Sequence, residues 1–205
     1  MNKKEALIQE IQEAFKGVKL DEGIGLWEAQ GHDDRVSDVE CKKLRAKDEK
    51  EDWNNIPLIH LYQCSSSLTF FDAKGMRFHT PMFLLYAIGV FQKEQEELQK
   101  KGLLNGCSDP DIENRLQTIT DYAQDSLGYQ QLYTKPFSLF SGKQLKCILK
   151  FLEFKLSELE MYYKSNDAKE LGLLPTAVKY NKDYMQLQEA LNCWIHNFKI
   201  EYVLK

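Results

Sequence analysis

Residues 141–163 carry the clearest helical pattern of the chain. Apolar side chains recur there every three or four positions, which places one set on a single face of an α-helix: Leu145, Ile148, Leu149, Leu152, Leu156, Leu159 and Tyr163. Ahead of them, Ser141 and Gln144 have the spacing of a capping box. A second apolar stripe of Cys147, Phe151 and Phe154 predicts that other elements cover this helix on two sides. We therefore expect the helix to be central in the fold.

The same spacing dominates the rest of the chain. It predicts a first helix that ends at Gly17, a second that Asp21 caps and a third over about residues 38–53. Asp109 is expected to cap a further helix, whose apolar stripe is Ile112, Leu116, Ile119, Ala123 and Leu127. The last predicted helix runs from Tyr184 to Phe198. Repeats and long linkers are absent from the sequence. We predict an all-α (mainly α) fold, a single compact multi-helix domain over residues 1–205 with a helical C-terminal part from about 109 to 205.

One segment allows two interpretations. Leu68–Phe71 and Met76–His79 could form a short β-hairpin around the turn Asp-Ala-Lys-Gly. Alternatively, Asp72 is an N-cap and a helix begins at Ala73 and continues through Pro81. The helix is favoured, because a lone two-stranded hairpin has no neighbouring sheet to complete it.

Charge and composition narrow the classes of partner. With 31 acidic and 27 basic residues the net charge is −4, which gives no electrostatic reason to expect nucleic acid or an anionic membrane as a partner. The apolar run Met82–Phe91 is far shorter than the roughly 20 residues that span a bilayer. Five scattered cysteines, without a C-x-x-C pair, are typical of a reducing compartment. We expect a soluble, cytoplasmic protein.

Polar residues next to buried surface are the candidates for a site. They form a proposed polar cluster of Glu28, Asp33, Asp34, Arg45, Asp48, Glu49, Asp52, Asp72, Arg77 and His79. In one hypothesis His32 and His79 bind a transition metal together with two carboxylates, Asp34 among the candidates. In another, Arg77 binds an anion and His79 titrates beside it. The favoured interpretation is structural: Asp34 or Asp48 pairs with Arg35, Arg45 or Arg77, and His79 donates to a backbone carbonyl.

Familiar catalytic and nucleotide-binding motifs are absent from the sequence. The serines at 65–67 lack a G-x-S-x-G context, so nucleophilic catalysis has no support. No glycine-rich loop has the spacing that cradles phosphates. We assign no catalytic residue and no cofactor from these patterns.

Three segments together resemble a family of uncharacterised, mostly bacterial proteins described as a domain of unknown function. They are GIGLWEAQGHDD (23–34), RAKDEKEDW (45–53) and SSLTFFDAKGMRFHTPMFL (66–84), which are similar to GLxEAxxxDD, DEKxDW and FFDAxGMRFHxPxFL elements. The resemblance covers about residues 19–89, with a weaker similarity over 137–152. It includes the polar cluster and Trp53, but His32 departs from the pattern, which weakens a metal scheme that needs it. Because the family has no established activity, the resemblance implies no mechanism.

The residue patterns and the resemblance leave two functions open. The first is a non-catalytic binding or interaction module, for example an immunity protein that neutralises a toxin, with aromatic residues available for a partner-facing surface. The alternative is an enzyme or ligand receptor that uses the carboxylate, histidine and arginine cluster in one pocket, with or without a metal. The second predicts that these groups converge on a common cavity.

Overall fold

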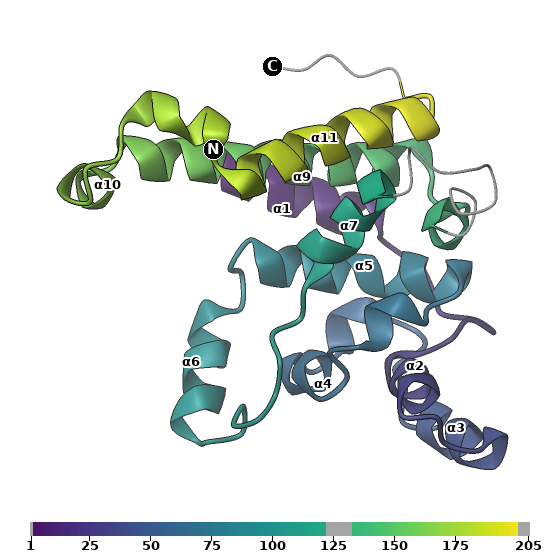
Figure 1. The fold of residues 1–205 in the computed structure, drawn as a ribbon. Helices are drawn as coiled ribbons and strands as arrows, with labels where there is room; N and C mark the ends of the chain where they lie inside the picture. Colours follow the sequence, from purple (N-terminus) through teal and green to yellow (C-terminus); the bar gives the residue numbers. More distant parts are fainter. Residues whose placement is uncertain (1, 122–132, 201–205) are drawn as a thin grey trace.

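The computed structural model describes residues 2–121 and 133–200, and in these ranges all regular structure is helical (Figure 1). The all-α prediction is therefore confirmed. Of the stripe expected after Asp109, Ala123 and Leu127 lie outside the described residues. Within the described ranges, no helix combines the length and the apolar character needed to cross a membrane.

Residues 2–121 and 133–200 contain α-helices and 3-10 helices. The α-helices are α1 (Lys3–Ala14), α2 (Leu26–Asp33), α3 (Asp38–Arg45), α4 (Leu58–Gln63), α5 (Ala73–Ala87), α6 (Gln92–Lys100), α7 (Ile112–Asp121), α9 (Gly142–Lys164), α10 (Asn166–Glu170) and α11 (Lys182–Asn197). Short 3-10 helices occur at η1 (Trp53–Asn55), η2 (Ser67–Thr69), η3 (Lys135–Phe137) and η4 (Pro175–Tyr180).

Two layers meet along one apolar core. In Figure 1, α9 and α11 lie side by side, α1 packs on α9, and α5 lies between this layer and the smaller helices α2, α3, α4 and α6. The core contains large fully buried side chains from both layers, including Phe15, Trp53, Phe83, Phe151 and Trp194. Helix α9 packs on α1 and on α11, so its prediction as a central helix covered on two sides is confirmed.

Local capping sets most helix starts. Ser141 and Gln144 form the predicted capping box at α9. At α5, the Asp72 side chain accepts the N–H of Gly75 at 2.8 Å, so the helix begins at Ala73 and the hairpin interpretation is wrong. Pro81 lies inside this helix.

Three expected boundaries are wrong. Asp21 does not cap α2: it has a φ of 50°, and the helix begins at Leu26 after Gly25. Helix α3 ends at Arg45 rather than near residue 53. At α7 the side chain that accepts the N–H of Asn114 is that of Asp111, not that of Asp109. At α2 and α7, another polar side chain meets the backbone N–H groups better than the expected one does.

Candidate functional site

The predicted polar cluster is divided between several structural roles. Asp48 is buried, and its carboxylate accepts the N–H groups of Trp27 at 2.7 Å and of Glu28 at 3.4 Å. It therefore caps α2 from a residue outside that helix. Burial raises the pKa of Asp48 to about 6, against the opposing effect of the two backbone hydrogen bonds.

Gly25 makes this cap sterically accessible. A Cβ at position 25 would lie 2.0 Å from Asp48 Oδ2, so only glycine lets the carboxylate approach the start of α2. The backbone of Gly25 itself is extended, with a φ of −82°. The constraint on this position is thus close approach, not backbone conformation.

Arg45 holds the loop ahead of α2. Its guanidinium forms an ion pair with Glu28 at 2.9 Å and donates to the carbonyls of Asp21, at 2.8 Å, and of Gly23. Arg45 was expected to pair with Asp34 or Asp48, but its carboxylate partner is Glu28. Arg45 pairs with Glu28 in the first turn of α2, because Asp48 is taken up by the backbone at the start of that helix.

Three further carboxylates of the predicted polar cluster, those of Glu49, Asp52 and Asp72, also accept backbone N–H groups. Glu49 Oε1 accepts from Lys50, Glu51 and Asp52 at 2.9, 2.8 and 3.2 Å, and these bonds lower the pKa of Glu49. Asp52 accepts the N–H of Asn54 at 3.0 Å. Asp72 Oδ1 accepts the N–H of Ile24 at 3.0 Å besides that of Gly75, which ties the loop before α2 to the start of α5.

Arg77 and His79 both lie on α5 but contact different parts of the structure. Arg77 Nε donates to the Oε1 atom of Gln144 at 3.2 Å. His79 is 1% exposed, stacks on Phe71 with ring centroids 4.5 Å apart, and its Nδ1 lies 2.8 Å from the carbonyl oxygen of Gly75. Desolvation lowers the pKa of His79 to about 4, so the ring is neutral at pH 7 and Nδ1–H is the donor. The contact with a backbone carbonyl is the one expected from the structural interpretation.

The residues of the metal hypothesis do not converge. His32 is exposed and lies beside Cys41, with Nδ1 3.9 Å from Sγ, while Asp33 and Asp34 are exposed at the end of α2. In residues 2–121 and 133–200, no group of three His, Cys, Asp or Glu side chains is arranged to hold a metal ion. The geometry gives this scheme no support.

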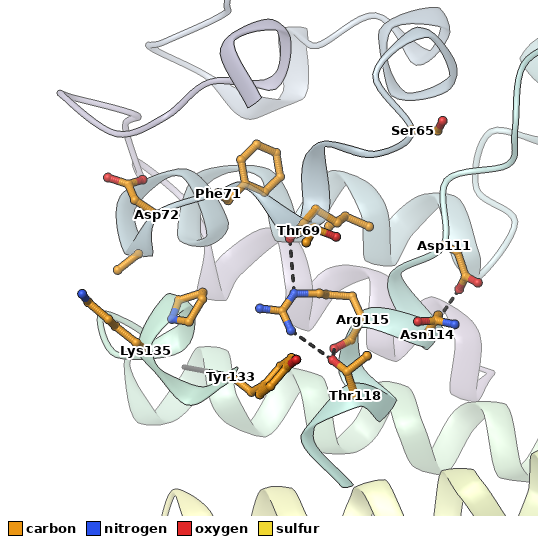
Figure 2. Close-up of a pocket in the computed structure, with 13 residues that line it drawn as sticks. Ser65, Thr69, Phe71, Asp72, Asp111, Asn114, Arg115, Thr118, Tyr133 and Lys135 are labelled. Atoms are coloured by element: carbon orange, nitrogen blue, oxygen red, sulfur yellow. Dashed lines mark hydrogen bonds between the residues drawn. The ribbon is translucent and has the colours of Figure 1, made fainter. Parts of the chain in front are cut away.

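A cavity of about 600 Å³ opens where η2, the start of α5, α7 and η3 meet (Figure 2). Of the predicted polar cluster, only Asp72 lines it. The other lining residues are Ser65, Leu68, Thr69, Phe71, Ala73, Asp111, Asn114, Arg115, Thr118, Tyr133, Lys135 and Pro136. Its volume lies within the roughly 300–1,000 Å³ of small-molecule sites.

Arg115 is one of the charged groups that line this cavity, and Figure 2 shows its guanidinium between Thr69 and Tyr133. Nε donates to the carbonyl of Leu68 at 3.2 Å, and Nη1 donates to Thr118 Oγ1 at 3.0 Å. The guanidinium lies 5.8 Å from the ring centroid of Tyr133 and 5.4 Å from that of Phe137. Within the described ranges no carboxylate forms an ion pair with it. Burial lowers the pKa of Arg115, although the group stays protonated.

Sequence reasoning missed Arg115. The pattern predicted α7 and its buried stripe of Ile112, Leu116 and Ile119, and all three are buried. Arg115 precedes a stripe residue, a position from which an arginine usually reaches solvent. Its proximity to Leu68 comes from the packing of α7 against η2, which no local pattern reveals.

The chain matches a known protein family over most of its length. A family described as a family of unknown function, DUF6714, matches residues 3–172 of the 205-residue chain. No curated protein and no solved structure matches. The family match extends well beyond the motif elements of residues 19–89 and includes the Asp48 cap, α5 and the cavity around Arg115. The chain belongs to the DUF6714 family of unknown function.

Proposed function

We propose that this protein is a non-catalytic binding module, and that the cavity around Arg115 is its ligand site. The observation that carries the proposal is a cavity of about 600 Å³ with a half-buried guanidinium on its wall that has no carboxylate partner among the described residues. A cation that is partly removed from water is less favourable unless a negative or polar group compensates the lost hydration. A ligand that enters the cavity would supply that compensation.

The roles of the acidic residues support binding over catalysis. Asp48, Asp72 and Asp111 accept backbone N–H groups at helix starts, so these carboxylates are held as caps. His79 lies in the core behind Phe71 and is neutral at pH 7. General acid or base work requires groups within hydrogen-bond reach of a substrate. Asp48 and His79 do not line the cavity, and Asp72 and Asp111, which do, each accept backbone N–H groups through one carboxylate oxygen.

The test is a thermal-shift screen of small molecules against the wild type and two matched variants. Ala73 lines the cavity, so Ala73→Leu fills part of it, whereas Ala46→Leu makes the same change at an exposed position. We expect ligands that raise the Tm of the wild type and of Ala46→Leu but not that of Ala73→Leu. Ligands that shift all three proteins equally would place the binding site elsewhere and refute the proposal.

A protein partner is the second candidate, as in a toxin-neutralising immunity protein of the cytoplasm. It is favoured by exposed apolar side chains between the end of α9 and the start of α11, among them Leu171, Leu174 and Tyr180 at 69, 67 and 85% exposure. Exposed apolar groups of this size are typical of interfaces. Loss of a co-purifying protein in Leu174→Glu, with retention in the equally exposed control Val39→Glu, would support this candidate. Equal recovery with both variants would contradict it.

A further inference from the structure

We infer that the cavity around Arg115 binds a compact monocarboxylate that carries an apolar body. The inference deepens the proposed function and rests on it. Its starting point is the set of donors that the guanidinium presents together with the charge and the lining of the cavity.

The first step is the hydrogen bonding of Arg115. A guanidinium has five N–H donors, and the described residues accept two of them: Leu68 O takes Nε–H and Thr118 Oγ1 takes one hydrogen of Nη1. The second hydrogen of Nη1 and both of Nη2 have no acceptor in the described ranges. Donors on two adjacent nitrogens match the two oxygens of a carboxylate.

The second step is the rigidity of that donor group. The Leu68 carbonyl and Thr118 fix the guanidinium from two sides, and the rings of Tyr133 and Phe137 lie within 6 Å of it. Since its geometry is set before a ligand arrives, little side-chain freedom is lost on binding. Burial also lowers the pKa of Arg115, as expected for a cation that is partly removed from water.

The third step is the charge of the lining, which selects a single negative charge. Two cations, Arg115 and Lys135, share the wall with two carboxylates, Asp72 and Asp111. One oxygen of each carboxylate is held by backbone N–H groups. Because two cations and two carboxylates give this wall no net formal charge, the second negative charge of a phosphate dianion gains no net attraction from it, while removing that charge from water costs more than it does for a carboxylate. The balance of charges therefore disfavours phosphorylated ligands.

The fourth step is the apolar part of the wall. Leu68, Phe71, Ala73 and Pro136 line the same cavity. Apolar walls with a few polar groups are typical of sites for small organic molecules, in which the polar groups set orientation. The ligand is thus oriented by its carboxylate at Arg115 and covered by the apolar residues along its body.

The experiment compares three probes with one shared body by isothermal titration calorimetry at pH 7.5. They are 3-phenylpropionate, 3-phenylpropionamide and 2-phenylethylphosphonate. For the wild type we expect the carboxylate to bind at least tenfold more tightly than either of the other two. Ala73→Leu should weaken the binding of all three, whereas Ala46→Leu should behave as the wild type.

Variants of Arg115 and of a control arginine test which group binds the carboxylate of the ligand. In Arg115→Gln the ratio between carboxylate and amide affinities should fall below threefold, while the exposed control Arg35→Gln keeps it. Because Arg115 also supports η2, Arg115→Lys is measured beside it, and circular dichroism verifies that each variant is folded. Lysine keeps the charge without the fork, so we expect an intermediate ratio.

The outcomes separate the two proposals. A phosphonate or amide that binds as tightly as the carboxylate, and that Ala73→Leu weakens, would overturn the carboxylate inference and leave the cavity as the ligand site. Failure of all three probes to bind the wild type would also overturn the carboxylate inference, and the screen with Ala73→Leu tests the cavity independently. Binding of the probes that Ala73→Leu leaves unchanged would overturn both.

Discussion

At the scale of single residues, two buried titratable groups shape how stability depends on pH. Asp48 has a pKa raised by burial to about 6, and His79 has one lowered by burial to about 4. Both shifts mean that the charged form of the group is less favourable in the folded protein than in the unfolded chain. Their effects on stability have opposite directions with pH.

For Asp48 we predict a loss of stability as pH rises from about 4 to about 6. The folded protein binds the proton more tightly than the unfolded chain, so stability is present below the unfolded pKa and declines up to the folded one. A shift of this size corresponds to about 2–3 kcal/mol. Asp48→Asn keeps an acceptor for the Trp27 N–H without the charge, and Asp48→Ala removes the cap.

Urea denaturation from pH 4 to 7.5 measures these effects. The wild type should lose stability relative to Asp48→Asn over this range, and at pH 7.5 Asp48→Ala should be less stable than Asp48→Asn by about 1–2 kcal/mol. If the free energy of unfolding changed with pH in the same way for the wild type and for Asp48→Asn, the raised pKa of Asp48 would be refuted.

For His79 we predict the opposite dependence. The unfolded chain binds the proton more tightly, so stability is full above the unfolded pKa of about 6.5 and is lost as pH falls towards 4. His79→Phe keeps a ring against Phe71 and does not titrate, so the wild type should lose about 3 kcal/mol relative to it over that range. NMR titration of the His79 ring checks the cause, and a midpoint near 6.5 would contradict it. Since the two dependences oppose each other, the wild type alone should show little change.

At the scale of elements, the start of α2 depends on a residue that lies beyond α3. Asp48 reaches the first N–H groups of α2, and Gly25 provides the room for it. The end of α3 and the start of α2 are therefore one structural unit, in which Arg45 adds the ion pair with Glu28. Capping by a distant side chain satisfies the same orphan donors as a local N-cap.

We predict that Gly25→Ala lowers the free energy of unfolding by about 1–3 kcal/mol, because the new Cβ would lie 2.0 Å from Asp48 Oδ2. The cost should be smaller in an Asp48→Gly background, where the clash is removed, and a double-mutant cycle in urea measures this coupling. Gly142→Ala is the matched control, since a Cβ there meets nothing within 4 Å. An equal loss at both positions would show that loss of glycine, and not the clash, is responsible.

At the scale of the whole molecule, α11 joins the core that α7, α9 and η3 form. Trp194 of α11 is fully buried, and its Nε1–H donates to the carbonyl of Leu116 at 3.0 Å. Its ring packs edge-on against Phe137, with centroids 4.8 Å apart, and stacks on Phe198. The helix lies after the residues that the family match covers, yet it packs on α9 and on α7, the helix that carries Arg115.

Trp194→Ala should therefore lower the free energy of unfolding by about 3–5 kcal/mol, the usual cost of removing a large buried side chain. The half-buried Trp27 is the control, and Trp27→Ala should cost less. Guanidinium denaturation followed by circular dichroism compares the two. Similar decreases in the free energy of unfolding for both variants would mean that Trp194 contributes no more to stability than the half-buried Trp27 does.

Local patterns in the sequence determined the helical class, the capping box of α9, the start of α5 at Asp72 and the buried stripe of α7. These features depend on residues three or four positions apart, so their physical causes lie within one or two helical turns. Local patterns predicted the wrong start for α2, because the cap of that helix is Asp48, a residue outside the helix.

Only the tertiary structure decided which polar residues share a site. The polar cluster predicted within residues 28–79 is divided among caps, an ion pair and a buried histidine, whereas the cavity combines Asp72 with Arg115 and Lys135 from later segments. The spacing of apolar residues predicts which face of a helix is buried, but it does not predict which distant backbone carbonyl a side chain of that helix contacts. Whether Arg115 reaches solvent or a cavity wall is set by the packing of α7 against η2, and that packing is a property of the whole chain.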